Sequence, residues 1–241
     1  MRRRNILRGI RGSLNRFLSI LFIVALGAGF LAGLFATTPD MEESCDRYMD
    51  ETRWYDIDVK SSQGFTREDA AAVAHVAGVE AVQPARVMDM VLTDGGAAEY
   101  TARVYALFDQ NGQTQLCGVQ LLEGRMPQSA NECVLQSSLG RYADHAVALG
   151  DTLRLMREDR SYETLSGYVS TEELTVVGIA RSPMSISVES ESSSAGSGSI
   201  GLHVFVPEDF YTFDFYTDVY VCAAGAAAEN AFTDAYTALI D

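Results

Sequence analysis

The first 39 residues divide into a basic segment and a long run without charge, and this division constrains the chain more than any other feature. Six arginines and no acidic residue occur among residues 1–16. Residues 17–39 then carry no charged side chain, and residues 17–36 are mostly apolar. About 20 apolar residues in a helix cross the hydrocarbon core of a bilayer. We therefore predict a transmembrane helix at residues 17–38.

The basic flank also predicts an orientation, because lysine and arginine stay on the cytoplasmic side of a membrane. The N-terminus is then cytoplasmic, and the chain after residue 40 lies outside the cell (plasma) membrane. The alternative is a cleaved signal peptide, whose apolar region is usually about 7–15 residues long and ends at a small-x-small site. The run here is longer, and residues 34–38 read LFATT, a poor cleavage match. We favour a retained anchor.

Residues 1–16 are themselves patterned, with apolar side chains at helical spacing and the arginines largely elsewhere. This pattern predicts a basic cytoplasmic amphipathic segment that lies on the inner membrane surface. A plain positively charged flank with no further role is the alternative, and the sequence does not decide between them.

The part after residue 39 is strongly acidic. It holds all 33 acidic residues and 12 of the 18 basic ones, which leaves a formal charge of −21. Such a charge repels nucleic acid and anionic lipid headgroups, so we expect the lipid bilayer as a partner through the anchor and no nucleic acid.

No residue pattern predicts catalysis, a cofactor or a metal. The four cysteines lack a C-x-x-C pair and zinc-type spacing, and they could form one of three disulfide pairings or stay free. There is no P-loop, G-x-S-x-G or S-x-x-K motif, and we read the acidic side chains at residues 42–51 as a solvated helix face. We therefore expect no catalytic, cofactor-binding or metal-binding residues, and a protein that is not an enzyme. The histidines are far apart: His75, His145 and His203.

The outer part predicts an α+β fold. Residues 55–61 alternate as a strand does, and residues 67–77 read as a helix that starts at a capping box of Thr66 and Asp69. Residues 79–93 are strand-rich with an interruption at Pro84, and an Asp-Gly-Gly turn leads into a return strand at 97–108. This β-α-β-β order is part of a split βαβ arrangement.

Further along, the pattern predicts an inserted β-rich subdomain. We place the first part of an α/β subdomain at residues 39–108 and the β-rich subdomain at 109–181. A serine-rich loop follows at 182–201, whose centre, 190–199, has no apolar anchor and should be mobile. The α/β subdomain resumes at 202–241 and should end in an alanine-rich helix over 226–240.

Several segments, taken in order, resemble the first part of an FtsX-like or MacB-like ABC transporter permease. Residues 4–8 read RNILR, 64–69 read GFTRED and 76–84 read VAGVEAVQP. The most specific match is LEGRMP at 122–127 followed by NECVL at 131–135. LGDTL at 149–153 and LTVVGI at 174–179 complete the set. Each segment alone is weak evidence, and their shared order makes the resemblance specific.

The resemblance implies an extracytoplasmic porter-like βαβ subdomain with a β-rich insertion after the first membrane helix. It also implies a permease subunit that couples a separate ATPase to export or extraction of a peptide or lipid-type substrate, or to mechanical signalling outside the cell. A second permease copy or homologue is the other implied partner. Because no second apolar span follows, we expect the sequence to be a fragment of a longer permease, its N-terminal portion. The alternatives are a single-pass anchored binding or sensor module and an anchored hydrolase.

Overall fold

The computed structural model describes residues 14–96, 98–108, 114–137, 147–156, 167–185 and 191–241, and the chain forms two compact units. The first unit spans residues 1–47 and the second residues 48–241. Helix α2 (Leu14–Thr52) supplies the described part of the first unit and the beginning of the second. It is the one described helix that is long and apolar enough to cross a membrane. Residues 1–13 of the predicted amphipathic segment lie outside the described residues.

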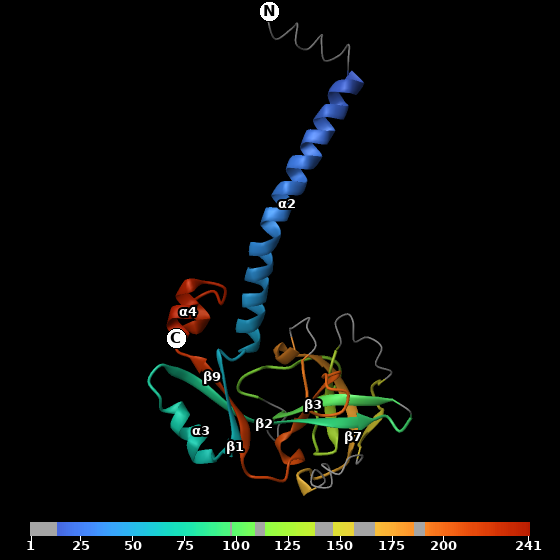
Figure 1. Cartoon of the computed structure of the whole chain (residues 1–241), viewed down its shortest axis with the longest axis vertical. Helices are drawn as coiled ribbons and strands as arrows, with labels where there is room; N and C mark the ends of the chain where they lie inside the picture. The colour runs from blue at the N-terminus through green and yellow to red at the C-terminus, as the bar shows by residue number, and fades with distance from the viewer. Residues whose placement is uncertain (1–13, 97, 109–113, 138–146, 157–166, 186–190) are drawn as a thin grey trace, which may run out of the picture. The chain divides into compact units, whose positions relative to one another are not determined.

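The second unit is built on one continuous mixed sheet (Figure 1). Its strand order is β1-β9-β2-β3-β8-β5-β7-β4, and β6 pairs with both β2 and β7. The other helices are α3 (Arg67–Ala74) and α4 (Asp234–Ile240), with 3₁₀ turns at Pro183–Ser185, Glu208–Phe210 and Ala226–Ala228. The strands are β1 (Ile57–Phe65), β2 (Val79–Thr93), β3 (Glu99–Phe108), β4 (Gln120–Gly124), β5 (Glu132–Gln136), β6 (Thr152–Leu155), β7 (Glu173–Arg181), β8 (Leu202–Pro207) and β9 (Tyr216–Ala223).

The predicted α+β class is confirmed, and so is the local order of strand, helix and hairpin. β1 and β2 both run antiparallel to β9, which lies between them, and α3 connects them. The helix begins at the predicted capping box, because Thr66 and Asp69 bond to each other's backbone N–H groups. Ala70 of α3 packs on Val219 and Val221 of β9. This is the split βαβ arrangement, visible beside β9 in Figure 1.

Two apolar cores cover the opposite faces of the strands from β2 to β7. One contains Met90, Val104 and Val204, and the other contains Tyr105, Phe108 and Phe205. Residues 104–107 of β3 alternate between the two cores, as the period of two in a strand requires, and Phe108 follows Leu107 into the same core after a register shift. The finer subdomain boundaries that we place at residues 108, 181 and 201 stay predictions.

The interruption that the sequence predicts at Pro84 is absent. Residues 79–93 form one uninterrupted strand, because at Pro84 β2 has a pairing partner in β9 only, and pairing with β3 begins at Arg86. A residue without an N–H is tolerated where one side of a strand is unpaired. β1 contains a bulge between Lys60 and Phe65, and Gly64 within it has a φ of +81°.

The alanine-rich end is not one helix. It forms a 3₁₀ turn at Ala226–Ala228 and a separate helix, α4, at Asp234–Ile240. Side chains between them bond to the local backbone: Asn230 accepts from the Phe232 N–H, and Thr233 caps α4 by accepting from the Tyr236 N–H. Asparagine and threonine compete for backbone groups in this way, which outweighs the helix propensity of alanine.

The serine-rich stretch is also more ordered than its composition predicts. Among its described residues, Ala195 and Ile200 are buried, and Ser192 pairs with Ser199. Our expectation that nothing anchors this stretch is therefore wrong. Its small side chains allow a close approach to the sheet, and a Cβ added to Gly196 would lie 2.3 Å from Oγ1 of Thr101.

Candidate functional site

Groups that carry catalytic or metal chemistry are scattered in the described part of the chain. No group of three or more His, Cys, Asp or Glu residues there could hold a metal ion. His75 contacts a carbonyl of its own helix, His203 lies in β8, and His145 is outside the described residues. The four cysteines, Cys45, Cys117, Cys133 and Cys222, are free thiols.

The sequence motifs that carry the permease resemblance come together around β7. We call residues 121–132, 149–151 and 174–179 the motif cluster. The backbone N–H of Arg125 donates to the carbonyl of Val177 at 2.9 Å, and that of Gly150 donates to Val176 at 2.8 Å. The N–H of Thr175 donates to Asn131 at 2.8 Å. Three motifs far apart in sequence are therefore bonded to one strand.

Side-chain hydrogen bonds also connect residues within the motif cluster. The Arg125 guanidinium donates through Nη1 to Glu132 at 2.7 Å, and the Gln128 N–H donates to the same carboxylate at 2.9 Å. The hydrogen bond from Arg125 holds the pKa of the Glu132 carboxyl below its ordinary value. A Cβ on Gly178 would lie 2.5 Å from the carbonyl oxygen of Arg125. These motif residues serve the folding of the β-rich region.

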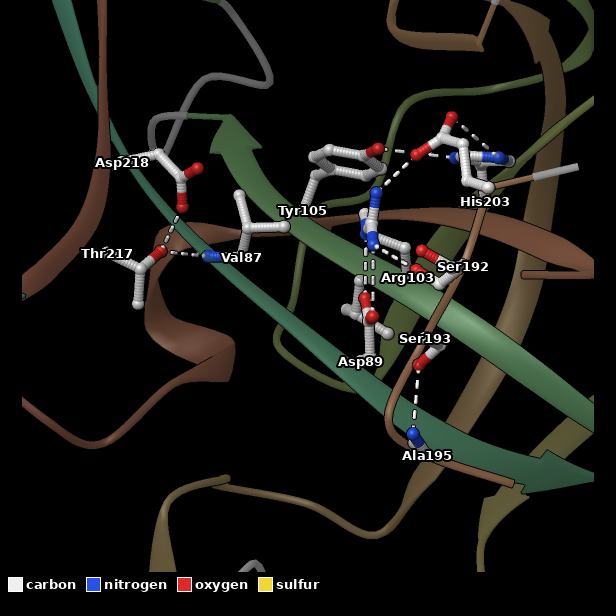
Figure 2. Close-up of polar contacts among 12 residues, drawn as sticks. Val87, Asp89, Arg103, Tyr105, Ser192, Ser193, Ala195, His203, Thr217 and Asp218 are labelled. Atoms are coloured by element: carbon white, nitrogen blue, oxygen red, sulfur yellow. Dashed lines mark hydrogen bonds and ion pairs between the residues drawn. The ribbon is translucent and has the colours of Figure 1, made fainter. Parts of the chain in front are cut away.

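A second group of polar residues, which we call the charged cluster, lies on the central strands of the sheet. It contains Asp89 on β2, Arg103 and Tyr105 on β3, and His203 on β8 (Figure 2). Glu191, within the serine-rich segment, completes it. Register explains the first contact, because Asp89 and Arg103 are direct partners in the antiparallel β2–β3 pair. Register also places His203 beside Arg103 in the parallel β3–β8 pair.

Arg103 is the centre of this cluster. Its Nε and Nη2 donate to the two oxygens of Asp89 at 2.7 and 3.0 Å, and its Nη1 donates to Glu191. Nη2 also reaches the carbonyl of Ser192 at 3.4 Å. The bond to Asp89 raises the pKa of the guanidinium against the opposing effect of burial. A bidentate, half-buried ion pair of this kind is well defined in geometry.

The pKa shifts of His203, Tyr105 and Glu191 all favour the neutral form of the side chain. Burial and the nearby Arg103 cation lower the pKa of His203 to about 4. Its Nδ1 lies 3.3 Å from the hydroxyl of Tyr105, whose pKa is raised by burial. Burial also raises the pKa of the Glu191 carboxyl, although Arg103 opposes that shift. The cluster thus fastens the serine-rich segment to the sheet and has no nucleophile poised for catalysis.

A further group of charged residues lies on the α/β part of the sheet, on β1 and β9. Lys60 on β1 lies 2.8 Å from both Asp58 and the buried Asp218, its register partner on β9. Burial alone would lower the pKa of Lys60, but its hydrogen bonds to the two carboxylates outweigh burial and raise it. Beside it, the hydroxyl of Thr217 accepts from the N–H of Val87, which joins β9 to β2 (Figure 2).

Backbone hydrogen bonds join the start of the second unit to the loop that precedes β4. The carbonyl of Thr52, at the end of α2, accepts from the N–H of Gly118 at 2.7 Å, and that of Arg53 accepts from Cys117 at 2.9 Å. Burial raises the pKa of the Cys117 thiol to about 12 and that of Cys222 to about 11, so both thiols are protonated at neutral pH and poor nucleophiles. The contact between residues 52–53 and 117–118 therefore has a structural role.

Comparison with known proteins places this architecture in a family. Residues 17–239 match the MacB-like periplasmic core domain. The chain belongs to this family. The MacB-like domain is similar to the periplasmic region of MacB from Actinobacillus actinomycetemcomitans, with 16% identity over 75% of this chain and 72% of that chain and a TM-score of 0.39. It is also similar to the extracellular domain of the noncanonic ABC-type transporter YknZ from Gram-positive bacteria, at 14% identity, 74% and 88% coverage and a TM-score of 0.39.

No curated protein matches the chain. As a MacB-like periplasmic core domain preceded by an apolar helix, the chain is a membrane-anchored component of a transporter permease and not a typical enzyme. Sequence reasoning found the motif cluster through its family-like segments. It missed the charged cluster, because the predicted hairpin did not fix the register that pairs Asp89 with Arg103.

Proposed function

We propose that the chain acts as a permease subunit of an ABC transporter, in which it couples a separate ATPase to events outside the membrane. The event would be export or extraction of a peptide or lipid-type substrate, or mechanical signalling. The observation that carries this proposal is the family match over residues 17–239, which takes in the apolar helix as well as the domain. The sequence contains no P-loop, so ATP hydrolysis would belong to another subunit.

We further propose the membrane arrangement that the arginine distribution predicts. The N-terminus would be cytoplasmic, residues 17–38 a retained anchor, and residues after 40 extracytoplasmic. A second permease copy or a homologue would complete the membrane part. The firm backbone bonds between Thr52, Arg53 and the 117–118 segment support a lever-like role, because they give the sheet a fixed connection to the helix end that precedes it.

The test is purification of the tagged full-length chain from native membranes after cross-linking within the intact membrane. We expect a P-loop ATPase in stoichiometric amount and ATP hydrolysis by the purified complex. An unrelated tagged single-span protein of the same membrane is the control. Recovery of the chain without an ATPase, but with an extracellular ligand or partner, would favour the alternative of an anchored binding or sensor module.

A further inference from the structure

A row of aromatic rings lies beside the connection between β8 and β9. We call Tyr168, Tyr211, Phe213 and Phe215 the aromatic ladder. The ring centroid of Phe213 is 5.1 Å from that of Tyr211, 5.7 Å from Tyr168 and 4.4 Å from Phe215. Phe213 and Phe215 are stacked, with 26° between their planes. The rings therefore form one continuous surface rather than separate contacts.

The aromatic ladder is held in place by the surrounding backbone. The Tyr211 hydroxyl donates to the carbonyl of Val104 at 3.0 Å, and the N–H of Thr212 donates to the carbonyl of Tyr168 at 2.9 Å. Phe215 lies directly against Gly64, where an added Cβ would be 2.6 Å from the ring. Only glycine suits that position, since its φ is +81°. Binding of a partner would therefore not have to order these rings, which lowers the entropic cost of binding.

The outer rings of the ladder are open to solvent. Tyr168 is 38% exposed and Phe215 is 39% exposed, while Tyr211 is buried behind them. Each of these two exposed rings contacts Phe213, so the three rings form a contiguous apolar surface, and exposed apolar surfaces mark interaction sites.

The contacts of Arg86 with Phe213 and Tyr216 indicate what kind of group binds to the rings of this region. The guanidinium carbon of Arg86 lies 4.8 Å from the ring centroid of Tyr216 and 5.9 Å from that of Phe213. Its Nε also donates to the carbonyl of Phe215 at 3.2 Å. Cations are attracted to the faces of aromatic rings. Among the described residues, Arg86 supplies the cation contacts of this region, so the faces of Tyr168 and Phe215 carry no described cation.

The charges around the ladder favour a cationic partner. Glu208, Asp209 and Asp214 are exposed in the same connection that carries three of the rings. The whole chain after residue 39 has a formal charge of −21, which attracts cations over a longer range and repels anions.

We propose that the aromatic ladder is a docking surface for an extended peptide segment that bears lysine or arginine side chains. The cations would lie against the exposed parts of the Tyr168 and Phe215 rings, and Asp214, between the two phenylalanines, would add electrostatic attraction. The inference does not depend on the proposed transport function, because binding is measured on the chain alone.

The test uses the full chain in phosphatidylcholine nanodiscs, whose zwitterionic surface does not attract a basic peptide. Fluorescence polarisation compares a labelled seven-residue peptide with alternating arginine and glycine against the same peptide with citrulline in place of arginine. We expect saturable binding of the arginine peptide and much weaker binding of the citrulline peptide. Equal binding of the two peptides would overturn the proposal.

Two substitutions separate a ring-face contact from apolar or purely electrostatic association. Tyr168→Leu and Phe215→Leu keep an apolar side chain but remove the ring, so each should weaken binding of the arginine peptide roughly two- to fivefold. Phe232→Leu, at another exposed ring, is the matched control and should bind as the unchanged chain does. Melting curves by circular dichroism confirm that each variant is folded. Unchanged binding in both folded ladder variants would overturn the proposal.

Discussion

Backbone contact at Gly178 shows how a single residue joins separate motifs. A Cβ added there would lie 2.5 Å from the carbonyl oxygen of Arg125 and 2.9 Å from the Leu121 side chain, closer than a real Cβ approaches, and 3.1 Å from Val134. The tightest of these neighbours is a backbone atom, which cannot rotate away. The glycine in the TVVG segment is therefore required by the approach of the residue 125 turn to β7.

Replacement of Gly178 by alanine should lower stability markedly. Forcing an extra methyl group into a packed site costs about 1–3 kcal/mol. For a domain of this size the loss corresponds to a fall in melting temperature of roughly 2–12 °C. The control is Gly167→Ala, because nothing lies within 4 Å of the position of its added Cβ. Thermal melts followed by circular dichroism compare the two, and equal melting temperatures would contradict the close contact.

His203 gives the stability of the domain a defined dependence on pH. Burial and Arg103 lower its pKa to about 4, whereas an unfolded histidine titrates near pH 6.5. The unfolded chain therefore binds a proton first as the pH falls, and the folded state loses stability between pH 6.5 and 4. Glu191 acts in the opposite sense, because burial raises its pKa and favours its protonation in the folded state.

Replacement of His203 by asparagine should therefore reduce the loss of stability on acidification. The histidine contributes about 2–3 kcal/mol of that loss between pH 7 and pH 4.5. Chemical denaturation at the two pH values measures it, and His75→Asn, at an exposed position on α3, is the control. If the variant and the parent chain lose the same amount, the neutral histidine is not the source of the pH dependence.

Among the elements, the serine-rich segment is the one whose conformation depends most on distant residues. Glu191 reaches Arg103, and the N–H of Ser197 donates to Oγ1 of Thr101 at 2.9 Å. The N–H of Gly201 donates to the carbonyl of Thr101 at 2.8 Å. The segment is thus held by β3, about 90 residues earlier in the sequence.

Removing one of these bonds should loosen the segment without changing its shape. Thr101→Val keeps the volume of the side chain but removes the acceptor for Ser197. A lost hydrogen bond of about 1 kcal/mol should speed amide hydrogen exchange at Ser197 by roughly five- to tenfold. Thr93→Val removes a similar acceptor in the exposed hairpin and should leave Ser197 unaffected. Unchanged exchange in Thr101→Val would mean that other contacts hold the segment.

The elements that the sequence predicted well are those governed by local patterns. Alternation marked the strands, and Thr66 with Asp69 marked the start of α3. The failures have tertiary causes: Pro84 is tolerated because one side of β2 is unpaired there, and small serine-rich side chains pack because the sheet offers a close fit. The charged cluster is intermediate. Asp89 and Arg103 lie on the two strands of the predicted hairpin, but their pairing depends on its exact register, and His203 joins them through a parallel pairing that no local pattern encodes.

The membrane arrangement belongs to the scale of the whole chain and can be tested by labelling. In a background with Cys45→Ser and Cys222→Ser, single cysteines are placed by Ser13→Cys and by Gln128→Cys, an exposed position in the second unit. A membrane-impermeant maleimide added to intact cells should label position 128 and not position 13. Both should react after the cells are permeabilised. Labelling of position 13 in intact cells would contradict a cytoplasmic N-terminus.

The continuity of β2 gives the second unit a mechanical property. Residues 79–85 of this strand pair with β9, and residues 86–93 pair with β3, so a single backbone belongs to two neighbouring ladders. Tension along β2 would load both ladders in shear, where many hydrogen bonds resist together instead of opening one at a time. A force applied to the βαβ part would then be transmitted directly to β3 and β8. The changeover between the ladders lies between Ala85 and Arg86, next to Pro84, which lacks an N–H, and β2 would yield there first.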